Sequence, residues 1–221
     1  MNTLPVFPTP LEETYGKGIP TFSCFWLHGL GASPQHFFGV PPALCLPASW
    51  SGRFIYPAAP PRAVTLNQGY IMPAWYDIYS LQRQGPEDET GLLQSETFLR
   101  QLIDAEIQRG IPAERIVLIG FSQGGATALY TGLRYPQRLA GIAALSSYLP
   151  CRHTLTSVNT NTPIFMAHGQ LDPVVPYPFG RASGDQLTQW GCAMTWKEYS
   201  MQHQVSETEL QDLGQWLQGL W

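Results

Sequence analysis

A serine stands between two glycines in the motif Gly120-Phe121-Ser122-Gln123-Gly124. The strand-like run from Arg115 to Ile119 precedes it directly, and residues typical of a helix follow it. A nucleophile held on such a tight strand-to-helix turn has a strained backbone, so the residues two positions away from it must be small. The pattern predicts that Ser122 is a nucleophile. The alternative is an ordinary glycine-rich turn before a helix.

A serine nucleophile needs a base to take its proton and an acid to orient that base. Asp172 follows the strand predicted from Pro163 to His168, and His203 follows the strand predicted from Met194 to Tyr199. Where a G-x-S-x-G turn carries the nucleophile, the acid and then the histidine come later in the chain. We therefore expect Asp172 to be the acid and His203 the base, although an Asp before a proline is by itself more often a turn residue.

The remaining histidines fit the base position less well than His203. His36 and His153 lie in polar or proline-flanked loops away from the required place in the topology. His168 ends a predicted strand, and we expect it to form a hydrogen bond that shapes the acid loop.

A second glycine-rich turn, His28-Gly29-Leu30-Gly31, follows the first clear strand, from Thr21 to Leu27. In hydrolases with this strand-turn-helix arrangement, the loop after such a strand supplies one amide of the oxyanion hole, and the residue after the nucleophile supplies the other. The backbone amides of Leu30 and Gln123 are therefore the candidates. A simple turn is the alternative for the first of them.

The elements that must position these residues follow from the hydrophobic pattern. Short apolar runs alternate with amphipathic stretches, as in β-α units that feed a mostly parallel sheet buried on both faces. The remaining strands are predicted at 53–56 and 141–146, with the strand before Ser122 at the sheet's centre. Helices are predicted at 92–107, near 181–190 and at 207–220, the last with a cap at residues 205–207. The stretch 57–89, rich in proline and glycine, is predicted to be weak in regular structure.

Composition limits the function classes. The 221 residues are 44% apolar and 13% charged, which indicates a folded protein. The length is typical of one α/β domain, which we expect to span residues 1–221. The net charge of −4, without a basic run, predicts neither a nucleic-acid nor an anionic-membrane partner. The first residues lack the pattern of a signal peptide, and no stretch reaches the roughly 18 apolar residues of an integral membrane segment. A cytoplasmic protein is expected.

Metal and cofactor motifs are absent from the sequence. Neither H-E-x-x-H nor a Cys/His ligand spacing occurs, and neither a dinucleotide fingerprint nor a P-loop is present. We therefore expect no metal and no cofactor. The four scattered cysteines are expected to be reduced and mostly buried.

Taken together, these motifs resemble the phospholipase/carboxylesterase family of α/β-hydrolases, which includes acyl-protein thioesterases. The resemblance covers nearly the whole chain. It rests on six blocks in order, namely residues 28–31, 72–78, 120–126, 145–150, 168–176 and 201–203.

The resemblance implies an α/β-hydrolase fold without a large cap domain, and a serine carboxylesterase that acts on short- to medium-chain acyl esters or thioesters. Its substrates would include an acylated protein or a lysophospholipid. It places Ser122, Asp172 and His203 in a catalytic triad. It also places Trp75, on the loop from Trp75 to Ile78, and Val174 beside the substrate. Without the resemblance, an aromatic cluster such as Trp75-Tyr76 is more often core packing.

Two residues depart from the family pattern. Ser147 stands where glycine is usual, and Gln202 precedes the histidine where Gly, Ala or an acidic residue is commoner. Both put the shape of the acyl groove in question. The segment from Ser147 to Thr162 is too short for a full lid, so we expect an open and shallow site.

Other functions remain open at this point. One is a hydrolase of another bond, such as a lactone or a peptide, and another is a non-catalytic α/β-hydrolase-fold protein that binds a ligand or partner. The chain is expected to be a monomer or a weak homodimer. Its C-terminal apolar residues pack on the sheet or form an interface.

Overall fold

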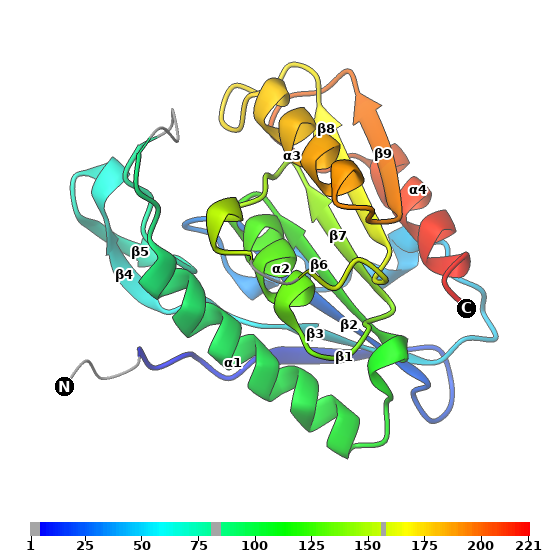
Figure 1. The fold of residues 1–221 in the computed structure, drawn as a ribbon. Coiled ribbons are helices and arrows are strands. Elements are labelled where there is room, and N and C mark those ends of the chain that lie inside the picture. The colour runs from blue at the N-terminus through cyan, green and yellow to red at the C-terminus, as the bar shows by residue number, and fades with distance from the viewer. Residues whose placement is uncertain (1–4, 81–84, 156–157) are drawn as a thin grey trace.

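The computed structural model describes residues 5–80, 85–155 and 158–221, and within them the centre is a seven-stranded sheet in the order β1-β3-β2-β6-β7-β8-β9 (Figure 1). Neighbouring strands are parallel except for β1 and β3, which are antiparallel. The strands are β1 Leu11–Tyr15, β2 Phe22–Leu27, β3 Gly52–Tyr56, β6 Ile116–Phe121, β7 Gly141–Leu145, β8 Ile164–Gly169 and β9 Met194–Tyr199. The predicted mostly parallel sheet is confirmed, with β6 at its centre.

Helices cover both faces of the sheet (Figure 1). On one face lie α1 Glu89–Gln108, α2 Gln123–Arg134 and α3 Tyr177–Gln189, and on the other lies α4 Glu207–Gln218. Side chains of β6 alternate between the two cores, with Leu118 in the first and Val117 and Ile119 in the second. Because every position of this strand is covered, its sequence is continuously apolar rather than alternating.

The parallel order explains how distant residues meet. The strands β6, β8 and β9 run in the same direction, with β7 between β6 and β8. The loops that follow their carboxyl ends therefore open at one edge of the sheet, where α/β proteins place their sites. Ser122, Asp172 and His203 all lie in these loops.

The last helix begins at the predicted N-cap, which the structure shows to be a capping box. The Ser206 hydroxyl accepts a hydrogen bond from the Glu209 amide at 3.2 Å. The Glu209 carboxylate accepts one from the Ser206 amide at 3.3 Å. At the other end of α4, Trp216 packs on Phe165 and Leu217 is buried. The packing interpretation of these C-terminal residues is thereby confirmed.

Three details of the prediction need correction. The edge strand β1, Leu11–Tyr15, was not predicted, because its sequence is mostly polar and its residues alternate only between half-buried and exposed positions. The stretch 57–89 contains an antiparallel hairpin of β4 Pro61–Val64 and β5 Tyr70–Pro73, joined through left-handed backbone at Gln68 and Gly69. The helices α1 and α3 begin three to four residues earlier than their hydrophobic periodicity indicates.

The chain between β7 and β8 forms no cap. In its described part, residues 146–155 and 158–163, the regular structure is the short 3-10 turn Arg152–Thr154. The expected fold without a large cap is therefore confirmed.

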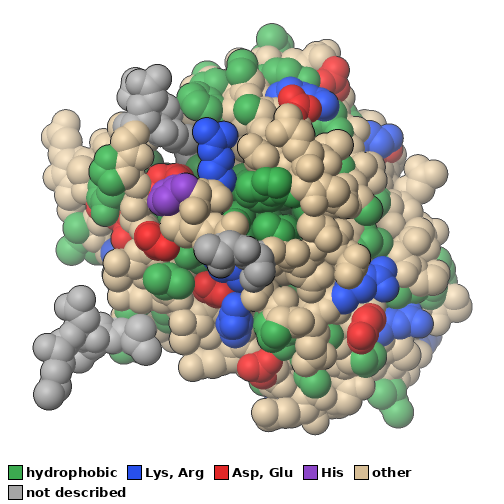
Figure 2. Space-filling model, viewed as in Figure 1, with side chains coloured by type: hydrophobic (Ala, Val, Ile, Leu, Met, Phe, Trp, Pro, Cys, Tyr) green, Lys and Arg blue, Asp and Glu red, His purple; other side chains and the backbone are tan. Residues whose placement is uncertain are grey.

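The surface carries charges of both signs. On the face drawn in Figure 2, basic and acidic side chains are scattered among each other rather than gathered by sign. Among the described residues, no helix has the length and apolar character needed to cross a bilayer. The four cysteines are free, and Cys45 is the exposed one.

Candidate active site

The turn at Ser122 has the strained geometry expected of a nucleophile. Its backbone angles are φ 54° and ψ −119°, in a region that non-glycine residues rarely adopt. A Cβ atom at Gly124 would lie 2.3 Å from the Leu27 carbonyl oxygen, and one at Gly120 would lie 2.3 Å from the backbone of Gly124. Both positions therefore require glycine, as predicted.

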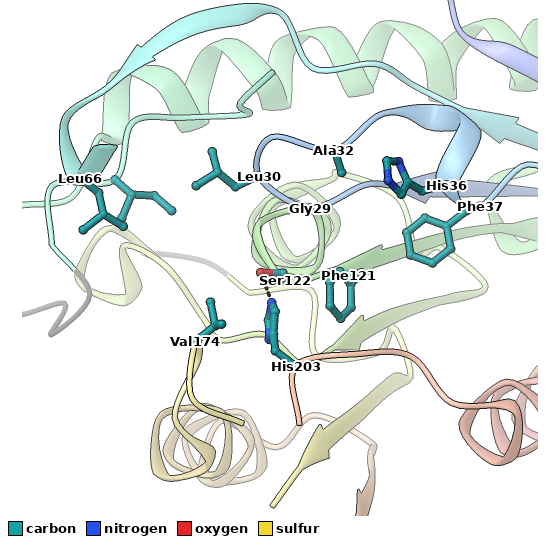
Figure 3. A pocket seen from close by; sticks show the side chains of 11 residues that line it. Gly29, Leu30, Ala32, His36, Phe37, Leu66, Phe121, Ser122, Val174 and His203 are labelled. Atoms are coloured by element: carbon teal, nitrogen blue, oxygen red, sulfur yellow. Dashed lines mark hydrogen bonds between the residues drawn. The ribbon is translucent and has the colours of Figure 1, made fainter. Parts of the chain in front are cut away.

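The structure brings the three predicted catalytic side chains into one hydrogen-bonded row. Ser122 Oγ lies 3.0 Å from His203 Nε2, and His203 Nδ1 lies 2.7 Å from Asp172 Oδ2. Figure 3 shows the His203 ring directed at the Ser122 hydroxyl. When Nδ1–H donates to the carboxylate, Nε2 is the free acceptor that can take the serine proton. The row can thus activate a serine hydroxyl.

The acid loop is held by its own backbone and by a second histidine. Asp172 Oδ1 accepts the amides of Val174 and Val175 at 2.8 and 2.9 Å. His168 Nε2–H donates to the Val175 carbonyl oxygen at 2.7 Å and lies 3.5 Å from Asp172 Oδ2. Burial lowers the pKa of His168, so the ring is neutral near pH 7. The prediction that His168 shapes this loop is confirmed.

The two candidate oxyanion amides flank the nucleophile. Gln123 is the first residue of α2, where helix N–H groups have no intrahelical acceptor. In the described part of the chain, neither its amide nor that of Leu30 donates to a protein acceptor. The next amide, Gly31, donates to Pro73 at 2.8 Å and so fixes the loop. Both donors are therefore available to a ligand oxygen.

His28 holds the start of the Leu30 loop. Its Nδ1–H donates to the Gly29 carbonyl oxygen at 2.8 Å, and its Nε2 accepts the Ala59 amide at 3.1 Å. The side chain is fully buried, and this burial lowers its pKa. His28 is thus a neutral structural residue.

Trp75 does not reach the substrate cavity, in contrast to the role implied by the resemblance. Its side chain has an exposed fraction of 0% and is not among the cavity-lining residues. The indole Nε1–H donates to the His28 carbonyl oxygen at 2.8 Å, and the Trp75 amide donates to Gln123 Oε1 at 2.9 Å. Trp75 therefore links the loop of Leu30 to Gln123. Ile78 of the same loop does line the cavity, as the resemblance implies for this loop.

A cavity of about 300 Å³ opens over Ser122. Val174 and Leu30, both predicted near the substrate, lie on its wall (Figure 3). The other lining residues are Gly29, Ala32, His36, Phe37, Leu66, Ile78, Phe121, Ser122 and His203. Sequence reasoning assigned no substrate contact to His36, Phe37 or Leu66, and no local pattern identifies them, since the cavity joins loops that are far apart in the chain.

The two departures from the family pattern occupy different environments. Ser147 is buried, and its hydroxyl donates to the Ser122 carbonyl oxygen at 2.7 Å. It therefore supports the nucleophile turn. Gln202 is exposed on the loop that carries His203.

Metal binding has no support in the described residues, which contain no group of three or more His, Cys, Asp or Glu able to hold an ion. The chemistry that this arrangement offers is attack by a serine hydroxyl on a carbonyl carbon, with amides placed for the developing oxyanion.

Comparison with known proteins identifies the family of this chain. The family model described as Phospholipase/Carboxylesterase matches residues 22–220. The chain is 41% identical over 219 residues to acyl-protein thioesterase 1 of Mycosarcoma maydis, covering 90% of this chain and 91% of that protein. It is 42% identical over 175 residues to acyl-protein thioesterase 1 of Schizosaccharomyces pombe, covering 76% of this chain and 75% of that protein.

Solved structures give the same picture. The crystal structure of acyl-protein thioesterase 2 of Zea mays superposes with a TM-score of 0.83 at 30% identity, covering 95% of this chain and 98% of that one.

Proposed function

Because the chain belongs to the phospholipase/carboxylesterase family, we propose that it hydrolyses short- to medium-chain acyl esters or thioesters through an acyl-enzyme on Ser122. The observation that carries the proposal is the row of hydrogen bonds from Ser122 through His203 to Asp172, at 3.0 and 2.7 Å.

The first step forms the acyl-enzyme. As Ser122 Oγ attacks the carbonyl carbon, its proton passes to His203 Nε2, and the carbonyl oxygen becomes an oxyanion. The amides of Leu30 and Gln123 donate to that oxyanion. When the tetrahedral intermediate collapses, the bond to the leaving oxygen or sulfur breaks, and His203 gives its proton to the leaving atom.

The second step regenerates the enzyme. A water molecule gives a proton to His203 Nε2 and attacks the acyl carbon, and the second intermediate collapses to the free acid. The proton on His203 returns to Ser122 Oγ. The Asp172 carboxylate stabilises the imidazolium that forms twice in the cycle.

The cavity supports an acyl chain of limited length. Leu30, Leu66, Ile78 and Val174 give it an aliphatic wall. Its volume of about 300 Å³ stands at the small end of the range typical of ligand sites. An alkyl chain against this wall loses contact with water and requires no hydrogen bonds.

The finer identity of the substrate belongs to the same proposal. An acylated protein or a lysophospholipid fits a site without a cap, since the rest of a large substrate can remain outside. The cytoplasmic location and the monomeric or weakly dimeric state stay predictions.

Ser122→Ala and His203→Ala test the mechanism. Each change is expected to lower kcat on p-nitrophenyl acetate by about three orders of magnitude or more, because the nucleophile or its base is lost. Steady-state kinetics measure the effect, and circular dichroism checks that each variant is folded. Retention of more than about a tenth of the wild-type rate by either folded variant contradicts the assignment.

A fluorophosphonate probe separates this proposal from a ligand-binding role. The wild-type chain is expected to be labelled at Ser122, as found by mass spectrometry, and Ser122→Ala is expected not to be labelled. A folded wild-type chain that is not labelled would support the non-catalytic alternative.

A further inference from the structure

One histidine outside the proposed triad lines the active-site cavity. His36 lies beside Phe37 on one side of Ser122, whereas Leu66 and Val174 lie on the other side (Figure 3). Among the cavity-lining residues of the described chain, His36 and His203 are the ionisable ones. The cavity therefore has two parts. Leu66 and Val174 line the part that we call the aliphatic arm. Phe37 lines the aromatic arm, which ends at the imidazole of His36.

The local structure leaves one ring nitrogen of His36 free to bind a ligand. Nδ1 accepts the Ser33 amide at 3.2 Å in the capping box of the 3-10 turn Pro34–His36. The Ser33 hydroxyl and carbonyl oxygens also lie 3.2 Å from Nδ1. When Nδ1 accepts from the Ser33 amide, the other nitrogen, Nε2, carries the ring proton. No described residue accepts from it.

The side chains that line the aromatic arm are held in place by ring packing. The Phe37 ring packs on the buried Trp26 ring with centroids 5.2 Å apart, and it lies 6.3 Å from the Phe121 ring. The Phe121 ring in turn lies 4.7 Å from the His203 ring. A continuous row of rings therefore leads from the catalytic histidine to the turn that holds His36.

The chemistry assigns the two arms to different parts of the substrate. The aliphatic arm suits the acyl chain, which has no group able to use an imidazole N–H. The leaving atom must lie within reach of His203 Nε2, from which it takes its proton. The leaving group then extends along Phe121 and Phe37 toward His36.

We propose that His36 binds an anionic oxygen group, a carboxylate or a phosphate, on the leaving thiol or alcohol. Its Nε2–H donates to that oxygen, and a charged acceptor strengthens such a bond. Ala32, which has a small side chain, also lines the cavity beside His36 (Figure 3). This inference rests on the proposed hydrolysis, and it specifies which substrates the site prefers.

Paired substrates, one anionic and one neutral in each pair, test the inference. The first pair is the octanoyl thioester of mercaptoacetate and that of its methyl ester, and the second is octanoylglycerol phosphate and octanoylglycerol. For the wild-type protein, kcat/KM is expected to be about fivefold or more higher for the anionic member of at least one pair. The pair that shows the preference identifies the group as a carboxylate or a phosphate.

Variants of the turn locate the origin of the preference. His36→Phe keeps a ring but removes the donor, so the anionic-to-neutral ratio is expected to fall to about 1, mainly through KM. His36→Gln keeps an N–H donor and is expected to retain part of the ratio. Gln35→Ala, an exposed neighbour in the same turn that does not line the cavity, is expected to keep the full wild-type ratio.

Two results would overturn the inference. One is a wild-type ratio of about 1 or less in both pairs, and the other is an unchanged ratio in folded His36→Phe. The proposed hydrolysis fails in a different way, namely when none of these substrates is cleaved or when Ser122→Ala cleaves them at the wild-type rate. Because the neutral substrates report hydrolysis and the ratio reports His36, the two failures are distinguishable.

Discussion

Asp172 uses its two carboxylate oxygens for different purposes. Oδ1 accepts the amides of Val174 and Val175, which fixes the rotation of the carboxylate, and Oδ2 accepts Nδ1–H of His203. The side chain is almost completely buried. Its orientation is therefore set by the backbone of its own loop before substrate arrives, which is the preorganisation that a proton relay needs.

Asp172→Asn is expected to reverse the tautomer of His203. Since two backbone amides require an acceptor at the Oδ1 position, the new NH2 group must face His203 Nδ1, which then becomes an acceptor and leaves the proton on Nε2. A protonated Nε2 cannot take the serine proton, so kcat is expected to fall by about 10⁴-fold with little change in KM, as in related triads. Ester hydrolysis under steady-state conditions measures both constants.

The exposed Asp185, which pairs with Arg181 on α3, provides the matched control. Asp185→Asn should leave both constants at their wild-type values. A loss of less than tenfold in kcat for folded Asp172→Asn would show that this carboxylate does not orient the base.

Among the elements, α4 begins directly after the loop that carries His203, and its first turn contains a buried acid. Glu209 has an exposed fraction of 0% and takes part in the capping box with Ser206. Burial raises the pKa of Glu209 to about 8. One carboxylate oxygen, Oε1, has no partner among the described residues. The protonated form therefore suits this site near neutral pH.

The sign of the pH effect follows from the raised pKa. Between about pH 4.5 and 8 the unfolded chain loses the Glu209 proton while the folded chain keeps it. Since the folded state binds more protons there, its free energy of unfolding falls as pH rises through this window. Glu209→Gln removes the titration and keeps a side chain suited to the capping box.

The variant is therefore expected to gain stability over the wild type between pH 5 and pH 8, by on the order of 2 kcal/mol. Urea unfolding at several pH values measures the free energy of unfolding of both proteins. The contributions of the other titrating groups are the same in both, so they cancel in the difference. Glu207→Gln, at an exposed position in the same turn, should show no such trend. A constant difference between Glu209→Gln and the wild type across this range would mean that Glu209 is ionised in the folded state.

At the scale of the whole molecule, three distant segments meet behind the cavity. The Trp75 indole N–H donates to the carbonyl oxygen of His28, the residue after β2. The Gln123 side chain accepts from the Trp75 amide and donates to the Tyr76 carbonyl oxygen at 2.7 Å. The Ser95 hydroxyl of α1 donates to the Trp75 carbonyl oxygen. The loop of Leu30 and the start of α2 at Gln123 are thereby linked through Trp75 and Tyr76, which do not line the cavity.

Trp75→Phe keeps most of the ring volume but leaves the His28 carbonyl oxygen without its indole donor. Stability is expected to fall by about 1–3 kcal/mol, because a buried acceptor loses its hydrogen bond. A displaced Leu30 loop should lower kcat by about tenfold while KM stays within about twofold, since Trp75 does not line the cavity. Urea unfolding and ester kinetics measure these effects.

Trp50→Phe serves as the matched control, since Trp50 packs on Phe22 and Trp221 near the strand starts, at the opposite edge of the sheet. Its kcat should equal that of the wild type. A rise in KM that grows with acyl-chain length in Trp75→Phe would instead restore the substrate-binding role that the family resemblance implies.

The sequence by itself determined the parts of this protein that depend on local pattern. Most of the parallel strands are buried apolar runs, so the strands of the central sheet from β2 onward were predicted to within about two residues. The turn at Ser122 required glycines, and the order of nucleophile, acid and base along the chain placed Asp172 and His203 at the ends of successive strands.

Only the tertiary structure decided which side chains share a cavity and which lie behind it. Trp75 and Ile78 are three residues apart, yet one faces the core and the other faces the cavity, and His36 reaches the same cavity from another loop. The edge strand β1 likewise depends on its partner β3 rather than on its own composition. Contacts between loops far apart in the chain leave no periodic signal, because they are set by packing and not by the repeat of a helix or strand.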